Sequence, residues 1–267
     1  MRFAQRPDGV RIAYEITGAG AQTILLVSPL AGTIALWGEF RERLAAHARV
    51  IAFDHRGLGD SSVAPLTTTT RALAADARAV LDDARIDRAD VVGSSLGGMA
   101  ATWLAADAAP RVRRLVLLST LVHSVEVAGS LRSAARVAKL ATCAVRGDRA
   151  MGRCLSDGIL SDRFQADHPD EAARIARTIA DAPRSRRSVL VLAAAAARHD
   201  ARSALRRISA PTLALAGALD PLVRADRMSR DLSALADVTC EVVPDCGHSI
   251  ALEAPAHVAD RVRAFLA

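Results

Sequence analysis

The sequence predicts an α/β fold: a mainly parallel, eight-stranded sheet with helices on both faces and an inserted helical cap. Two observations support this prediction. Short apolar segments alternate with helical patterns up to about residue 122, and again after residue 208. Between them, residues 123–207 show helical patterns only. We therefore expect a core domain of residues 1–122 and 208–267, and a cap domain of residues 123–207.

The first half of the chain begins with a hairpin pattern. Residues 3–5 and 10–16 flank Pro7-Asp8-Gly9, a turn sequence between two β segments. Strands and helices then alternate, and the apolar run at residues 23–27 indicates a strand buried on both faces. The expected strands are residues 23–27, 50–53, 89–92 and 112–119, and the expected helices are residues 34–46, 67–84 and 99 to about 110.

The second half supplies the cap and the last two strands. Alternation resumes after the cap with strands at residues 212–216 and 238–243. Helices are expected at residues 222–235 and 256–266. Within the cap, helical patterns cover residues 129–145, 150–155, 169–180, 184–198 and 201–206.

The composition restricts the class of protein. The 267 residues are 51% hydrophobic and 24% charged, which is typical of globular rather than disordered chains. The longest apolar run, residues 189–197, is far shorter than the ~20 residues that span a bilayer. The N-terminus lacks the apolar segment of a secretory signal. We therefore expect a cytoplasmic protein with no membrane partner, present as a monomer or a homodimer.

The charged and sulfur-containing residues indicate neither nucleic acid nor metal as a partner. The net charge of +6 comes from arginine, with Lys139 as the single lysine, and the arginines are scattered. Aromatic residues make up 3%, so the stacking platforms of single-strand binders are missing. The four cysteines form no C-x-x-C pair and are expected to be free thiols. The spacing of Cys240, Cys246 and His248 matches no usual zinc pattern.

A G-x-S-x-G motif, formed by Gly93, Ser95 and Gly97, stands between an apolar strand segment and an apolar helical segment. A sharp strand-to-helix turn holds the middle residue in a strained backbone conformation, and flanking glycines remove side chains that would collide with it. The turn lifts the serine hydroxyl clear of the sheet and directs the first amides of the helix toward a bound group. Ser95 is therefore the candidate nucleophile.

A serine nucleophile needs a base within hydrogen-bond reach and a third group that orients the base. In an open parallel sheet such groups lie after the carboxyl ends of strands. Asp220 follows the strand at residues 212–216, and His248 follows the strand at residues 238–243. Asp245 is an alternative partner of the histidine. The order serine, aspartate, histidine is that of the α/β-hydrolase fold.

Further short motifs extend over nearly the whole chain. They are Asp54-x-Arg56-Gly57-x-Gly59-x-Ser61, Gly93-x-Ser95-x-Gly97-Gly98-Met99, Pro110-Arg111-Val112, Pro211-Thr212, and Gly247-His248 before Glu253-x-Pro255. Together they resemble an α/β-hydrolase with a helical cap, and in detail the 3-oxoadipate enol-lactonase-like esterases. The resemblance implies that Ser95 is the nucleophile, His248 the general base and then acid, and Asp220 the orienting carboxylate.

An oxyanion hole needs two N–H donors. The amide of Leu96, directly after the nucleophile, is the first candidate. The second is expected in the loop after residue 27, where many relatives carry His-Gly-x and this chain has Ser28-Pro29-Leu30. Because proline has no N–H, Leu30 is the natural donor. This departure resembles the loop of enol-lactonases, which also lack the histidine.

Several residues are candidates for contact with a substrate. Trp37 either walls the pocket or packs in the core, and His123 lies just after a core strand, at the entrance of the cap. Enol-lactonases bind an anionic substrate, so the resemblance implies that a cap arginine such as Arg132, Arg136 or Arg163 binds a carboxylate.

The loop of residues 54–61 is expected to be structural. Its two glycines allow a tight turn near the site, and Arg56 is expected to brace the neighbouring loops by hydrogen bonds, with a contact to substrate as the alternative. The histidine of this loop, His55, is expected in a surface or loop position.

These expectations combine into a serine hydrolase that uses no cofactor and cleaves a carboxylic ester or lactone through an acyl-enzyme. The same scaffold supports other chemistry: hydrolysis of C–C bonds, perhydrolysis of the haloperoxidase type, and lyase or tailoring steps of natural-product pathways. A ligand receptor with slow turnover is the alternative outside catalysis.

Overall fold

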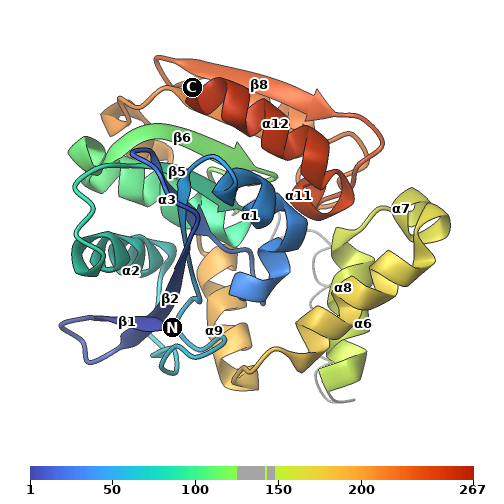
Figure 1. Cartoon of the computed structure of the whole chain (residues 1–267). Helices are drawn as coiled ribbons and strands as arrows, with labels where there is room; N and C mark the ends of the chain where they lie inside the picture. The colour runs from blue at the N-terminus through green and yellow to red at the C-terminus, as the bar shows by residue number, and fades with distance from the viewer. Residues whose placement is uncertain (125–141, 143–147) are drawn as a thin grey trace.

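The computed structural model describes residues 1–124, 142 and 148–267. At its centre is an eight-stranded sheet in the order β1-β2-β4-β3-β5-β6-β7-β8. β2 pairs antiparallel with β1 and β4, and all other neighbours pair parallel (Figure 1). The predicted α/β architecture is therefore confirmed. The strands are β1 (Arg2–Gln5), β2 (Arg11–Thr17), β3 (Thr23–Val27), β4 (Arg49–Phe53), β5 (Ala89–Ser94), β6 (Val112–Leu118), β7 (Thr212–Gly217) and β8 (Val238–Val243).

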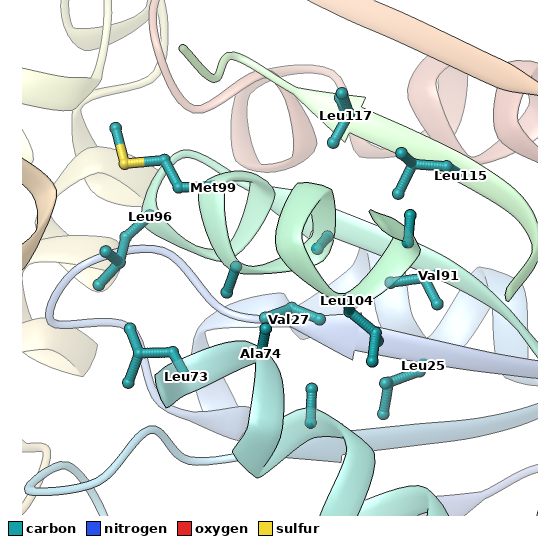
Figure 2. Close-up of a cluster of buried hydrophobic side chains, with 14 of the residues drawn as sticks. Leu25, Val27, Leu73, Ala74, Val91, Leu96, Met99, Leu104, Leu115 and Leu117 are labelled. Carbon is teal, nitrogen blue, oxygen red and sulfur yellow. The ribbon is translucent and has the colours of Figure 1, made fainter. Parts of the chain in front are cut away.

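Helices cover both faces of the sheet because its central strands are apolar on both sides. The elements around the sheet are η1 (Ile34–Trp37), α1 (Gly38–Ala45), α2 (Thr70–Asp83), α3 (Leu96–Asp107), η2 (Ala109–Arg111), η3 (Arg202–Arg207), α10 (Ala225–Leu232), α11 (Ile250–Glu253) and α12 (Pro255–Leu266). In β3, Leu25 and Val27 belong to the apolar cluster with α2 and α3, as Figure 2 shows. Ile24 and Leu26 point the other way, into a cluster with α1 and α12.

Between β6 and β7 the described residues form the helices α6 (Asp148–Ile159), α7 (Asp162–Asp167), α8 (Pro169–Asp181) and α9 (Arg186–Ala197), followed by η3. The group α6 to α8 stands beside the sheet in Figure 1 and has its own apolar cluster, which includes Phe164 and Ile175. By contrast, α9 packs Val189 and Leu192 into the cluster with α2 and α3. The predicted helix at residues 129–145 falls outside the described residues except for position 142, and the predicted domain boundaries stay a prediction.

Differences from the predicted helices have local causes. The helix predicted at residues 34–46 is split into η1 and α1 at Gly38, whose φ of 40° interrupts it. The helix predicted at residues 222–235 shortens to α10, because Asp220 binds the amides of the two residues after Pro221 and holds them in a turn. The short helices α7 and α11 give too few turns for a periodic signal. Within the described ranges, every helix is too short or too polar to cross a membrane.

Candidate active site

Ser95 occupies the turn between β5 and α3. Its φ of 52° and ψ of −115° are a backbone conformation that L-residues rarely adopt. A Cβ on Gly97 would collide with the carbonyl of Val27 on β3, and one on Gly93 would lie 2.5 Å from the Gly97 carbonyl oxygen. The Ser95 amide donates a hydrogen bond of 2.9 Å to the carbonyl of Leu118. The motif glycines are thus required by the close approach of neighbouring backbone segments.

The structure brings Ser95, Asp220 and His248 together in one row. His248 lies in the loop between β8 and α11, and its Nε2 is 2.9 Å from Ser95 Oγ. Its Nδ1 is 2.9 Å from Asp220 Oδ2. The other carboxylate oxygen of Asp220 accepts hydrogen bonds from the amides of Leu222 (2.7 Å) and Val223 (2.9 Å), which fix its orientation. Because a carboxylate only accepts hydrogen bonds, Nδ1 carries the imidazole proton and Nε2 faces the hydroxyl as an acceptor.

The alternative partner of the histidine, Asp245, lies outside this row. Its side chain is 63% exposed and accepts a hydrogen bond of 2.6 Å from Arg163. Arg163 also lies 3.5 Å from Asp167. Asp245 is therefore engaged with a surface arginine, and Asp220 is the carboxylate that contacts His248.

A cavity of about 730 Å³ opens beside Ser95 and His248. Among the described residues, its wall is formed by the loop after β3, η1, the second half of α6, the start of α7, part of α8 and the loops after β7 and β8. Most lining side chains are apolar, among them Leu30, Leu36, Leu155, Ile159, Ile179 and Leu222. The charged lining residues Asp157, Asp162 and Arg163 are exposed, so they lie where the cavity opens to solvent.

The residues that carry the predicted oxyanion donors are a lining residue of the cavity, Leu30, and the residue after the serine, Leu96. Leu30 lines the cavity together with Ser95. Leu96 is the first residue of α3, so its amide has no acceptor within its own helix. The indole Nε1 of Trp37 donates a hydrogen bond of 2.9 Å to Ser28 Oγ and thereby holds the loop that carries Leu30. The role of both amides as oxyanion donors stays a prediction.

Two of the predicted substrate contacts need correction. Trp37 and His123 are not among the described residues that line the cavity. Trp37 is 3% exposed and packs in the apolar cluster with α1 and α12, because its indole bonds the loop behind the cavity. His123 is buried, with its Nε2 3.6 Å from Asp231. Arg132 and Arg136 lie outside the described residues.

The loop of residues 54–61 braces its neighbours as predicted. Arg56 is 2% exposed, and its Nε donates a hydrogen bond of 2.7 Å to Asp76 on α2. Its Nη1 donates to Asp8, in the hairpin turn, at 3.1 Å. Arg56 does not line the cavity within the described part of the chain, which supports a structural role.

No local pattern gives Glu253 a role, yet its side chain contacts the residue directly before His248. Its carboxylate accepts hydrogen bonds from the amides of Gly247 and Ser161. Ser161 is 92 positions away, so no local pattern reveals this contact. The single available signal is the Glu253-x-Pro255 motif that follows Gly247-His248.

The described residues indicate neither a cysteine nucleophile nor a metal centre at this site. Cys246 is buried two positions before His248. Burial, together with the carboxylates of Glu253 and Asp245, raises the pKa of the Cys246 thiol to about 11. The thiol therefore stays protonated at neutral pH and is a poor nucleophile. Among the residues that the structure describes, no group of three or more histidine, cysteine or carboxylate side chains is arranged to hold a metal ion.

His55 lies in a loop, as predicted, but it is fully buried. Its Nε2 is 2.8 Å from the Ser28 carbonyl oxygen, so Nε2 carries the proton of a neutral ring. Burial lowers the pKa of His55 from 6.5 to about 4. Between pH 6.5 and about 4, His55 therefore binds a proton in the unfolded chain but not in the folded chain. The resulting contribution to stability, about 3 kcal/mol, is present above pH 6.5 and is lost as the pH falls toward 4.

We expect the variant His55→Gln to lose less stability in acid than the wild type. Between about pH 7.5 and about pH 4.5, its free energy of unfolding should fall by about 2–3 kcal/mol less. Urea denaturation of both proteins at the two pH values measures this difference, in which the contributions of other titrating groups cancel. Equal losses in both proteins would contradict the low pKa of His55.

Comparisons with known proteins agree with the observed fold. A family model described as alpha/beta hydrolase fold matches residues 22–255. The putative carbamate hydrolase RutD of Variovorax paradoxus is 33% identical over 241 residues, which cover 88% of each chain. The 3-oxoadipate enol-lactonase 1 of Acinetobacter baylyi is 28% identical over 223 residues, 80% of this chain and 78% of that protein. The solved structure of Est816, described as an N-acyl homoserine lactone degrading enzyme, matches with a TM-score of 0.84 at 27% identity over 99% of this chain and 100% of the other.

Some relatives are longer than this chain. It spans 30% of the length of the dihydrolipoyllysine-residue acetyltransferase component of the acetoin cleaving system of Cupriavidus necator, at 37% identity over 112 residues. The resemblance to esterases and enol-lactonases that the motifs predict is confirmed by the relatives and by the fold. Since the family model covers most of the sequence, the chain belongs to the alpha/beta hydrolase fold family.

Proposed function

We propose that this protein is a serine hydrolase that cleaves a carboxylic ester or a lactone through an acyl-enzyme. The observation that carries the proposal is the row of hydrogen bonds from Ser95 Oγ to His248 Nε2 and from His248 Nδ1 to Asp220, at 2.9 Å each, on the wall of a cavity. Serine becomes a useful nucleophile at neutral pH when a base accepts its proton during attack. The relatives support the same class, since their names describe cleavage of carbamates, enol lactones and acyl lactones.

The first half-reaction forms the acyl-enzyme. Ser95 Oγ attacks the substrate carbonyl carbon while its proton passes to His248 Nε2. The carbonyl oxygen becomes an oxyanion, which the amides of Leu30 and Leu96 stabilise. Asp220 stabilises the imidazolium and holds its orientation. When the tetrahedral intermediate collapses, His248 gives the proton to the leaving alkoxide, which departs as an alcohol or, in a lactone, stays attached to the acyl group.

The second half-reaction regenerates the serine. His248 Nε2 accepts a proton from water, and the hydroxide oxygen attacks the acyl carbonyl carbon. The same two amides stabilise the second oxyanion. The bond to Ser95 Oγ then breaks, Ser95 recovers its proton from His248, and the carboxylic acid leaves. The imidazole of His248 transfers every proton in the two half-reactions.

The lining of the cavity supports an uncharged substrate with an apolar body. Most of the described side chains that line the cavity are apolar, and transfer of a carboxylate into such surroundings without a partner is costly. The one arginine in the described lining, Arg163, already pairs with Asp245 and Asp167. These observations favour an apolar acyl group over the anionic substrate that the family resemblance suggests.

A series of p-nitrophenyl esters tests both the reaction and the substrate class. From acetate through butyrate to hexanoate, kcat/KM should rise about 4-fold per added methylene, which corresponds to about 0.8 kcal/mol each. The mono-p-nitrophenyl ester of adipic acid matches the hexanoate in length but carries a carboxylate, and it should react at least about 10-fold more slowly. Failure to hydrolyse any ester would contradict the function. Faster turnover of the adipate would contradict the substrate class alone.

A further inference from the structure

Glu253, the last residue of α11, connects two segments that are far apart in the sequence. Both oxygens of its carboxylate lie 3.0 Å from the Gly247 amide nitrogen, which donates to them. The carboxylate also accepts hydrogen bonds of 3.1 Å from the Ser161 amide and of 2.6 Å from the Ser161 hydroxyl. One side chain therefore joins the loop that carries His248 to the residue that precedes α7.

The two segments fit closely at this point. A Cβ on Gly247 would lie 2.7 Å from the Ser161 amide nitrogen and 2.8 Å from Glu253 Oε1, so a larger residue would push the segments apart. On the other side of the histidine, the Ser249 amide donates a hydrogen bond of 3.0 Å to the Ile159 carbonyl. The loop is thus bonded to residues 159–161 both before and after His248. These same residues form part of the cavity wall.

A carboxylate accepts every hydrogen bond of this contact. Three donor groups from Gly247 and Ser161 converge on Glu253, and a carboxylate offers acceptor positions on both oxygens. A glutamine of the same shape has one acceptor oxygen. Its NH₂ group can donate to the Ser161 hydroxyl, but it would face the Gly247 amide, which donates to both oxygens of the carboxylate. Burial raises the pKa of Glu253, while the hydrogen bonds from Ser161 and Gly247 favour its ionised form. Exchange of one oxygen therefore removes one of the two acceptors of the Gly247 amide and weakens the contact that holds the His248 loop.

We propose that Glu253 is a positioning residue, which fixes the His248 loop against residues 159–161 and so sets the distance from His248 Nε2 to Ser95 Oγ. The proposal rests on the proposed function of His248 as the base. His248 and the part of the cavity wall formed by residues 159–161 are then held in a fixed position relative to each other. A displacement of about 1 Å between reacting groups costs on the order of 100-fold in rate, so loss of this contact should act on turnover more than on substrate affinity.

The variant Glu253→Gln tests this proposal, with Glu241→Gln as the matched control. Glu241 is also a paired carboxylate, 2.6 Å from Arg261, but it lies on β8 away from the cavity. With p-nitrophenyl hexanoate, Glu253→Gln should lower kcat by about 10- to 100-fold and change KM by less than about 3-fold. The control should keep both constants. Because Ser161→Ala removes part of the same contact, the double variant Glu253→Gln with Ser161→Ala should be no slower than Glu253→Gln alone.

Several results would overturn the proposal. They are an unchanged kcat in Glu253→Gln, an equal loss in the control, a loss that appears in KM alone, or effects that multiply in the double variant. Should Glu253→Gln fail to fold, Ser161→Ala carries the test, with an expected loss in kcat of about 3- to 10-fold. Turnover that persists without Ser95 would refute the proposed function. Turnover that needs Ser95 but ignores Glu253 would refute this inference only.

Discussion

Replacing Ser95 by alanine is expected to lower kcat/KM for p-nitrophenyl hexanoate by about 10³- to 10⁶-fold. The alanine lacks the oxygen that bonds the acyl group, so only general stabilisation by the cavity and the backbone amides is left. The Ser95 side chain contacts His248 at the surface of the cavity, and its loss leaves the sheet and helices intact. Steady-state kinetics together with circular dichroism spectra of both proteins measures the effect. Turnover near the wild-type level would contradict the assignment of the nucleophile.

Ser95→Gly is the informative companion variant, because it separates catalysis from backbone strain. The φ of 52° at Ser95 is unfavourable for any residue with a Cβ and easily adopted by glycine. Relief of about 1 kcal/mol of strain should raise the Tm by roughly 2–4 °C over Ser95→Ala. Both variants should be equally inactive. Equal melting temperatures would contradict the strained conformation at the turn.

Asp220→Asn is expected to lower kcat by about 10³- to 10⁴-fold with the fold preserved. The amides of Leu222 and Val223 donate to Oδ1, so the carbonyl oxygen of the asparagine takes that position and its NH₂ group faces His248. An NH₂ group donates, which forces Nδ1 to lose its proton and Nε2 to carry it. Nε2 then no longer accepts the proton of Ser95. Steady-state kinetics on the ester series measures the loss.

Asp245→Asn is the matched control for this change. Asp245 is an aspartate three positions from His248, but its carboxylate faces Arg163 at the surface. Its replacement should leave kcat within about 2-fold of the wild type, since exposed ion pairs contribute little. A large loss in Asp245→Asn with little loss in Asp220→Asn would reverse the assignment of the orienting carboxylate.

Those residues of the site that are positioned by a local sequence pattern can be predicted from the sequence. The turn at Ser95 is encoded by glycines two positions away on each side, and Asp220 and His248 follow strands whose ends meet at one edge of the sheet. Contacts between segments that are far apart in the sequence leave no such local pattern. Trp37 shows why, because its spacing places it on the apolar face of a helix, and only the structure shows that this face meets the sheet instead of the cavity.

Some expectations from the sequence stay predictions. They include the roles of the three aligned residues and of the two oxyanion amides, the boundaries of the cap, the cytoplasmic location, and the monomeric or dimeric state. The predicted substrate arginines Arg132 and Arg136 belong to a segment outside the described residues. For Glu253 the difficulty is physical, since two strands, four α-helices and the 3-10 helix η3 separate it from its partner Ser161 in the chain order.

The separation of 153 positions between Ser95 and His248 has a consequence for biosynthesis. On the proposed mechanism, the ribosome adds the nucleophile Ser95 well before its base His248, so the nascent polypeptide contains the serine before it contains the proton acceptor. Chemistry begins only when the final strand and the loop after it have left the exit tunnel. On the proposed mechanism, a premature stop codon directly before residue 248 would therefore yield a catalytically silent product, although all eight strands are present.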